Sequence, residues 1–171
     1  MSTSLETRFD TTGPINLKVE LLVGDVTLTA GEAPTTTVRL VPRGKNGAGM
    51  AEKFTVEAHG NDVAVLAPKL RDSFFSIGTK GSVDVEVELP AASAVDAKTG
   101  AGDVTAAGLL GEVRATTGAG DLTFHEVGSA RLKSGSGDIT LQSASGDIDA
   151  KTGSGDITVG TGGGRLDLVS G

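Results

Sequence analysis

The sequence has 171 residues, enough for one domain of ordinary size, and its only aromatic residues are five phenylalanines. This scarcity argues against an aromatic-packed core and against an aromatic-lined groove for sugars or bases. A net charge of −7 argues against nucleic acid and anionic membrane surfaces as partners, and the lack of cysteine excludes disulfides, thiolate zinc sites and a cysteine nucleophile.

The N-terminal segment, residues 1–10, has neither the basic start nor the apolar stretch of a secretory signal. The longest apolar stretches, such as residues 21–23, are far too short to cross a bilayer. We therefore expect a cytoplasmic protein without direct membrane insertion.

The first half of the chain predicts short β-strands. Apolar residues alternate with polar ones at Leu17, Val19 and Leu21. Residues 23–28 then reproduce the glycine-aspartate repeat of the second half. Further strands are expected over residues 37–41, 54–58, 63–67 and 82–89, with a tight turn at residues 59–62. Loops are expected over residues 42–50 and 69–81, and no stretch has a helical period with caps. We interpret residues 1–90 as the irregular N-terminal strands and cap of a single domain that spans residues 1–171.

Residues 91–171 repeat a Gly-Asp-apolar motif with a period of nine residues, as in Gly102-Asp103-Val104 and Gly120-Asp121-Leu122. Two apolar columns result, two positions apart, which is the pattern of short half-buried strands. The first comprises Val95, Val104, Val113, Leu122, Ala130, Ile139, Ile148, Ile157 and Leu166, with one step of eight residues between Leu122 and Ala130. The second comprises Ala97, Ala106, Ala115, Phe124, Leu132, Leu141, Ala150, Val159 and Leu168. We expect Ile139, Ile148 and Ile157 to be fully buried.

Glycine lies two positions before the first apolar residue in eight of these units and predicts positive-φ corners between strands. The polar positions alternate with a longer period of eighteen residues. Alternate units carry threonine after the apolar residue, at Thr105, Thr123, Thr140 and Thr158. The units between them carry charge, at Asp96, Arg114, Arg131, Asp149 and Asp167. We therefore predict an all-β fold, a parallel β-solenoid of nine-residue half-coils with about 18 residues per coil. Two sides per coil is the simpler interpretation, and three sides remain an alternative.

The run SVDVEVELP at residues 82–90, the repeated G-[AS]-G-D-[VLI]-T units and the earlier VGDVTL at residues 23–28 resemble the bacterial "putative adhesin" family of β-strand-repeat proteins, also called toastrack domains. The likeness spans about residues 17–171. The resemblance implies a right-handed β-solenoid without established catalytic residues. It also implies an association with envelope-linked or membrane-stress systems.

The first candidate site is the column formed by Asp103, Asp121, Asp138 and Asp156. Stacked carboxylates would bind calcium in nonapeptide β-rolls, where the aspartate lies two positions after a glycine. Here each aspartate follows its glycine directly. We therefore expect each side chain to accept hydrogen bonds from backbone N–H groups of the turns, and we expect no metal or other cofactor.

Carboxylates at the spacing of stacked strands also match the separation used by retaining glycosidases. Catalysis would require a desolvated carboxyl and a sugar platform, which an exposed ladder without Trp or Tyr does not offer. The two histidines, His59 and His125, lack a nucleophile motif such as G-x-S-x-G. We expect no catalytic residues and no enzyme activity.

The repeat is still in phase at the last residue, so Leu166 and Leu168 would lie at an unpaired strand edge. Such edges template pairing with another chain, and we expect further repeats, a protein partner or a second copy to cover this one. The function expected is that of a non-enzymatic interaction or scaffold module. The alternatives are a calcium-stabilised or self-polymerising repeat protein and, less favoured, a carbohydrate-acting β-helix enzyme.

Overall fold

A computed structural model describes residues 3–68 and 81–171. The fold is all-β, because every strand of the described residues belongs to one hydrogen-bonded sheet and the one helix there is five residues long. No helix in these two ranges is long and apolar enough to span a membrane. The elements are β1 (Leu5–Asp10), β2 (Asn16–Val23), β3 (Val26–Gly31), β4 (Thr35–Gly44), α1 (Gly47–Ala51), β5 (Thr55–His59), β6 (Asp62–Leu66), β7 (Gly81–Pro90), β8 (Ala94–Ala101), β9 (Val104–Ala119), β10 (Leu122–Ser136), β11 (Ile139–Ala144), β12 (Ile148–Thr152), β13 (Ile157–Gly162) and β14 (Leu166–Ser170).

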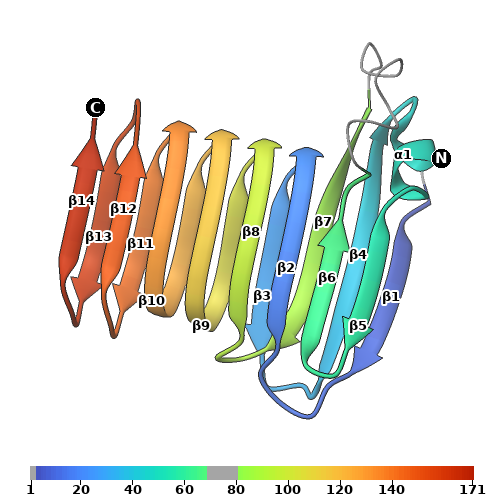
Figure 1. Cartoon of the computed structure of the whole chain (residues 1–171), viewed down its shortest axis with the longest axis horizontal. Helices are drawn as coiled ribbons and strands as arrows, with labels where there is room; N and C mark the ends of the chain where they lie inside the picture. Colours follow the sequence, from blue (N-terminus) through green and yellow to red (C-terminus); the bar gives the residue numbers. More distant parts are fainter. Residues whose placement is uncertain (1–2, 69–80) are drawn as a thin grey trace.

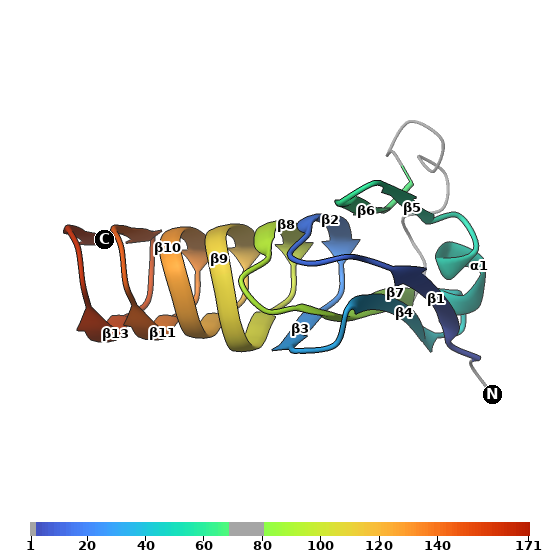
Figure 2. The ribbon, with the colours of Figure 1, turned by 90° about the horizontal axis from the view of Figure 1, so that it is seen from below.

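The chain folds into a stack of parallel strands in two layers, with the C-terminal end of the chain at one end of the stack (Figures 1 and 2). Strands β2, β8, β12 and β14 lie in one layer, and β3, β11 and β13 lie in the other. Strands β9 and β10 are long enough to contribute to both layers. The N-terminal half of β9 pairs with β3 and its C-terminal half pairs with β8.

Residues eighteen positions apart lie side by side over most of the repeat, as Val104 does beside Leu122. The register shifts between Phe124 and Glu126, where β9 contains one more residue than β10. Gly108, which has a φ of +86°, lies in this extra stretch of β9. The predicted step of eight residues between Leu122 and Ala130 is therefore absorbed as a bulge.

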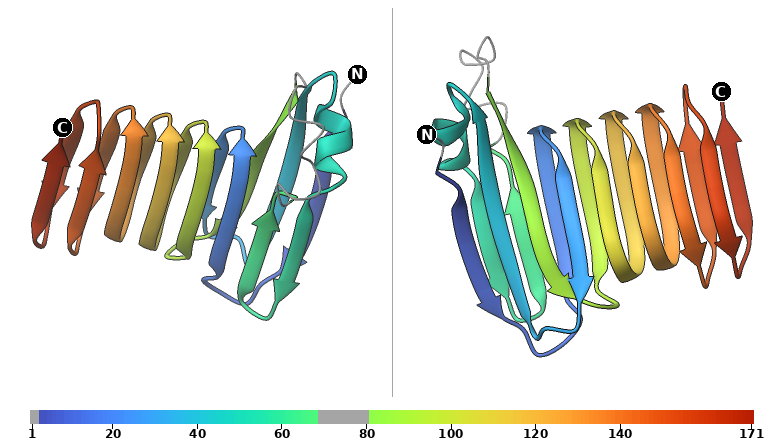
Figure 3. Two further views of the ribbon diagram at one scale, coloured as in Figure 1. Left: turned by 45° about the horizontal axis from the view of Figure 1, so that its top comes forward. Right: turned by 180° about the vertical axis from the view of Figure 1, so that it is seen from behind.

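The first coil of the stack is formed by β2 and β3. Leu17 pairs with Val95 and Val26 pairs with Val104, although the paired segments lie far apart in the sequence. Strands β4 to β7, which lie between β3 and β8 in the sequence, form the end of the molecule opposite the C-terminus (Figure 3). Strand β7 continues the layer of β3 in parallel and pairs antiparallel with β4 on its other side.

The predicted strands of this first half are present as β2 to β7, and the predicted turn at residues 59–62 joins the antiparallel pair β5 and β6. The loop predicted over residues 42–50 is wrong, because β4 runs on to Gly44 and α1 follows. A helix of five residues is too short to show a period, and its formation depends on packing, with Ala51 buried at 2% exposure. The loop expected over residues 69–81 lies outside the described residues except for Gly81.

The core is the pair of apolar columns between the two layers. Ile139 and Ile148 are buried, at 0% and 2% exposure, as are the members of both columns from Val95 to Ala150. The prediction of full burial for Ile157 is wrong, since this residue and Val159 are only half-buried. The physical reason is that β13 pairs only with β11 among the described strands, so one flank of its inward side chains is uncovered.

Candidate functional site

The aspartate column forms a ladder of hydrogen bonds along one corner of the stack. The Oδ1 atom of Asp103 accepts a hydrogen bond from the backbone N–H of Asp121 at 2.8 Å, and Oδ1 of Asp121 accepts one from the N–H of Asp138 at 2.8 Å. The same contact recurs along the whole series of Asp84, Asp25, Asp103, Asp121, Asp138 and Asp156. Each carboxylate from Asp84 to Asp138 in this series thus satisfies a backbone N–H of the neighbouring coil.

These hydrogen bonds give the aspartate column a structural role, because they link each coil to the next. Within residues 3–68 and 81–171, no group of three or more His, Cys, Asp or Glu side chains is arranged to hold a metal ion. One oxygen of each ladder carboxylate up to Asp138 is engaged by a backbone donor. The calcium hypothesis stays a prediction to be tested in solution.

A second ladder, which the sequence analysis did not identify, consists of hydroxyl groups inside the same corner. Thr117 is 2% exposed, and its Oγ1 donates to the carbonyl oxygen of Gly102 at 2.9 Å. Its members are Thr99, Thr117, Ser134 and Thr152, which donate to Gly24, Gly102, Gly120 and Gly137 respectively. A sequence pattern could have predicted this ladder, because a Ser or Thr stands three positions before each of the corner glycines Gly102, Gly120, Gly137 and Gly155.

The corner glycines are of two kinds. Gly120 has a φ of +148°, and a Cβ atom there would collide with the carbonyl oxygen of Gly102. Positive φ recurs at Gly24, Gly102, Gly137 and Gly155. The prediction of positive φ is wrong for the alternate units, at Gly111, Gly128, Gly146 and Gly164. These glycines are required by close approach instead, since a Cβ atom on Gly146 would lie 2.6 Å from the carbonyl oxygen of Gly128.

The threonine column lies in register on the outer face of one layer, as predicted, and it extends onto the N-terminal strands. Thr27 pairs with Thr105 on one side and with Glu86 on the other. Arg39 pairs with Glu86 and with Glu6, which completes a row of outward side chains across the sheet. Beyond Thr27, the hydroxyl groups of this row are therefore followed by charged side chains.

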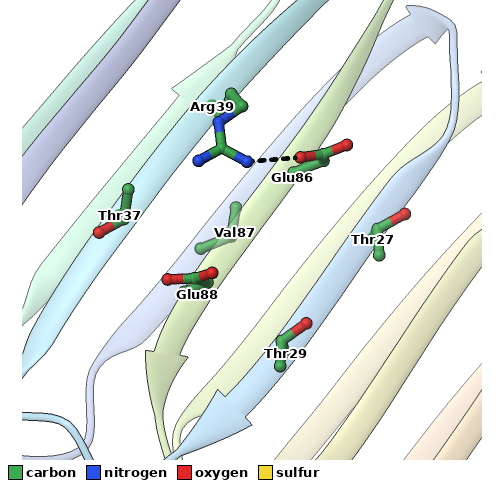
Figure 4. Close-up of a pocket in the computed structure, with 7 residues that line it drawn as sticks. All are labelled: Thr27, Thr29, Thr37, Arg39, Glu86, Val87 and Glu88. Atoms are coloured by element: carbon green, nitrogen blue, oxygen red, sulfur yellow. Dashed lines mark hydrogen bonds and ion pairs between the residues drawn. The ribbon is translucent and has the colours of Figure 1, made fainter.

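Arg39 is the electrostatic centre of that charged end (Figure 4). Its guanidinium donates to Glu6 Oε2 at 2.8 Å and to Glu86 Oε2 at 3.1 Å. These hydrogen bonds, first to Glu6 and then to Glu86, raise the pKa of Arg39 above its ordinary value. The shallow hollow beside it is lined by Thr27, Thr29, Thr37, Arg39, Glu86, Val87 and Glu88. Exposed ion pairs of this kind are screened by solvent and contribute little to stability.

The opposite layer carries the charged column on its outer face. Asp96 pairs with Arg114, Arg114 with Arg131, and Arg131 with Asp149 in the strand register. The Nε atom of Arg131 lies 3.9 Å from Oδ2 of Asp149. The two layers therefore differ in chemistry, one with hydroxyl groups and one with ionised groups.

The apolar C-terminal edge consists of Leu166, Leu168 and Val169, which are 48%, 41% and 49% exposed. Strand β14 pairs only with β12 among the described strands. Within the described residues, the inward side chains of Leu166 and Leu168 therefore have a neighbouring strand on one side, and their role as a contact edge stays a prediction.

The structure does not bring the two histidines together. His59 has 82% of its side chain exposed and lies 3.6 Å from the Glu57 carboxylate on the hairpin of β5 and β6. His125 is exposed on β10, on a strand that does not pair with that hairpin. A nucleophile, base and orienting group in mutual contact would be needed for triad chemistry, and these two positions do not supply them.

Solved structures and a protein-family model resemble this chain. A structure described as a putative cell adhesion protein from Clostridium sporogenes aligns with a TM-score of 0.59 at 12% identity, over 100% of both chains. A putative adhesin from Bacteroides fragilis aligns with a TM-score of 0.46 at 11% identity, over 98% of this chain and 97% of that one. No curated protein matches the sequence. The family model described as Toastrack DUF4097 matches residues 29–161, which confirms the resemblance drawn from the repeat. The chain belongs to the Toastrack DUF4097 family.

Proposed function

We propose that this protein is a non-enzymatic, adhesin-like interaction module built on a right-handed β-solenoid of nine-residue half-coils. Membership of the Toastrack family supports the solenoid, and the Clostridium neighbour, described as a putative cell adhesion protein, supports a binding role. The stack presents long outer faces, which suit binding to a macromolecule rather than enclosure of a small substrate.

The observation that carries the proposal is the apolar C-terminal edge. Leu166, Leu168 and Val169 are each between 41% and 49% exposed on a strand with one free side. In this proposal a protein partner, or a second copy of the chain, adds a strand to β14 and covers these side chains. Main-chain hydrogen bonds supply affinity in such strand addition, and the side chains at alternate positions supply specificity.

Light scattering across a concentration series tests the self-association form of this proposal. In ~0.5 M NaCl, where exposed ionic contacts are screened, we expect the apparent mass to rise with concentration. Leu168→Lys should abolish the rise, because it places a charge in the apolar contact. The matched control is Leu109→Lys, at a site of 43% exposure on β9 and away from β14. A chain that stays monomeric at every concentration would leave the edge to a different protein, and an unchanged profile for Leu168→Lys would overturn the edge as the contact.

Four further expectations stay predictions under this proposal. The protein acts as a single domain, binds neither nucleic acid nor the interior of a membrane, and resides in the cytoplasm. The link to envelope-associated or membrane-stress systems is the fourth. Fractionation of cells that express the full reading frame tests the location, and we expect the protein in the cytoplasmic fraction.

A further inference from the structure

In the last four members of the charged column, each charge meets an opposite charge when the order of the strands is reversed. Its members lie on the outer face of one layer, one on each of five neighbouring strands: Asp96 on β8, Arg114 on β9, Arg131 on β10, Asp149 on β12 and Asp167 on β14 (Figure 1). Two arginines are thus followed by two aspartates on successive strands, at a spacing of about 4.8 Å.

Within one chain this order leaves charges poorly compensated. Arg114 lies beside Arg131 and Asp149 lies beside Asp167, and like charges on directly opposed strand positions are destabilising. The nearest cations to Asp149 are Arg131 and Lys151, each at 3.9 Å. Moreover, Oδ1 of Asp149 is buried without a hydrogen-bond partner in the described part of the chain, which carries an energetic cost.

A hollow of about 410 Å³ runs along the same column. It is bordered on one side by Arg114, Arg131, Asp149 and Asp167 and on the other by exposed residues that include Glu112 and Arg165. The hollow therefore carries both signs of charge over four neighbouring strands, and its second row also contains Ser129 and Asp147.

We propose that two copies of this chain associate face to face through this layer, related by a two-fold axis that runs parallel to the strands between β10 and β12. This rotation reverses the order of the strands and keeps each position along the strand. Arg131 then faces the partner's Asp149, and Arg114 faces the partner's Asp167. In the second row of the hollow, Glu112 faces the partner's Arg165. Each of these contacts forms twice because the axis is two-fold.

The charges also select this register over its neighbours. An axis through β10 would place Arg131 against its own copy, and an axis through β12 would do the same for Asp149. Each of these alternatives brings like charges together, which costs affinity and so discriminates against the wrong register. In the favoured register Lys133 faces the partner's Lys151, on the side of the column away from the hollow, and these long side chains extend into solvent.

The contact covers four strands and is small compared with the area of about 800 Å² per partner in a standard interface. We therefore expect a weak dimer that depends on ionic contacts. This dependence separates it from the apolar C-terminal edge, whose association should persist in salt. Experiments can therefore test the contact through the charged face and the contact through the apolar edge independently.

Sedimentation equilibrium of the full chain tests the proposal. At low ionic strength we expect association that ~0.5 M NaCl weakens at least ~10-fold, and with Leu168→Lys in the same chain, which blocks the apolar edge, we expect a simple monomer–dimer equilibrium with the same salt dependence. Arg131→Asp and Asp149→Arg should each weaken the dimer by a similar factor, since each places like charges against the partner. The double variant should restore dimerisation, because the exchanged charges again face each other across the axis and remain neighbours within the chain.

Lys98→Glu is the matched control, a charge reversal on the same layer that lies outside the contact, and it should dimerise like the wild type. Melting curves by circular dichroism establish that each variant is folded. A wild type that is monomeric at low salt, or a double variant as weak as the single ones, would overturn the inference. Loss of association in Leu168→Lys at low and high salt alike would instead assign all self-association to the apolar edge.

Discussion

At the scale of single residues, the buried hydroxyl ladder explains why Ser or Thr stands inside an otherwise apolar corner. Thr117 is as buried as the core valines, yet its Oγ1 has the carbonyl oxygen of Gly102 at 2.9 Å. A buried polar group is tolerated when it is hydrogen-bonded. The ladder thus bonds each hydroxyl to the corner of the neighbouring coil.

Replacing Thr117 with Val should lower the free energy of unfolding by about 1–2 kcal/mol, because the carbonyl of Gly102 loses its donor while the volume is kept. Urea denaturation measures the change. Thr105→Val is the control, since Thr105 is exposed on the outer face and should change stability by less than about 0.5 kcal/mol. Equal effects at the two sites would contradict the role of the buried ladder.

At the scale of the strand and its corner, glycine determines whether successive coils can stack. The chain at Gly120 has a φ of +148°, and its α-carbon lies against the carbonyl of Gly102. Substitution Gly120→Ala should therefore destabilise the fold by at least about 2 kcal/mol, through backbone strain and steric overlap. Gly13→Ala should be close to neutral, because nothing lies within 4 Å of a Cβ atom there. Thermal melting of both variants makes the comparison, and similar melting temperatures would contradict it.

The aspartate ladder belongs to the same corner and makes a separate prediction. Asp121→Ala should cost about 0.5–1.5 kcal/mol, because the N–H of Asp138 loses its acceptor, whereas Asp121→Asn keeps an acceptor oxygen and should cost less. If the ladder is structural, calcium or a chelator should leave the melting temperature of the wild type unchanged. A clear rise with calcium would show that the carboxylates bind the ion.

At the scale of the whole molecule, a stack in which each coil contacts only its neighbours should open from its uncovered end. Residues 160–171 are all exposed, whereas the inward residues of β9 and β10 are buried on both flanks. Amide hydrogen exchange at low protein concentration should therefore be fastest in β13 and β14 and slowest in β9 and β10. Uniform protection along the stack would mean that the chain unfolds only as one unit or that its end is covered.

The local structure of residues 91–171 could be predicted from the amino-acid sequence alone. Alternation in steps of two placed Val104, Leu122 and Ile139 inside, and the Gly-Asp pairs marked one kind of corner, because both depend on short-range sterics and on burial repeated in every coil. Two predictions there were wrong. The burial of Ile157 depends on whether a strand covers the flank of β13 that β11 leaves open. The φ of the alternate corner glycines, such as Gly146, depends on how closely successive coils approach each other.

The contacts between segments that lie far apart in the sequence are known only from the tertiary structure. Residues 23–28 share the repeat motif, but only the fold shows that Val26 stacks directly on Val104. No local pattern predicts the formation of α1 or the contacts of Arg39 with Glu6 and Glu86. The pairing of the hydroxyl ladder with corner carbonyls belongs to the same class, since its partners are set by how one coil is placed on the next. Such contacts depend on chain closure over long separations, and the free energy that selects them comes from the completed core.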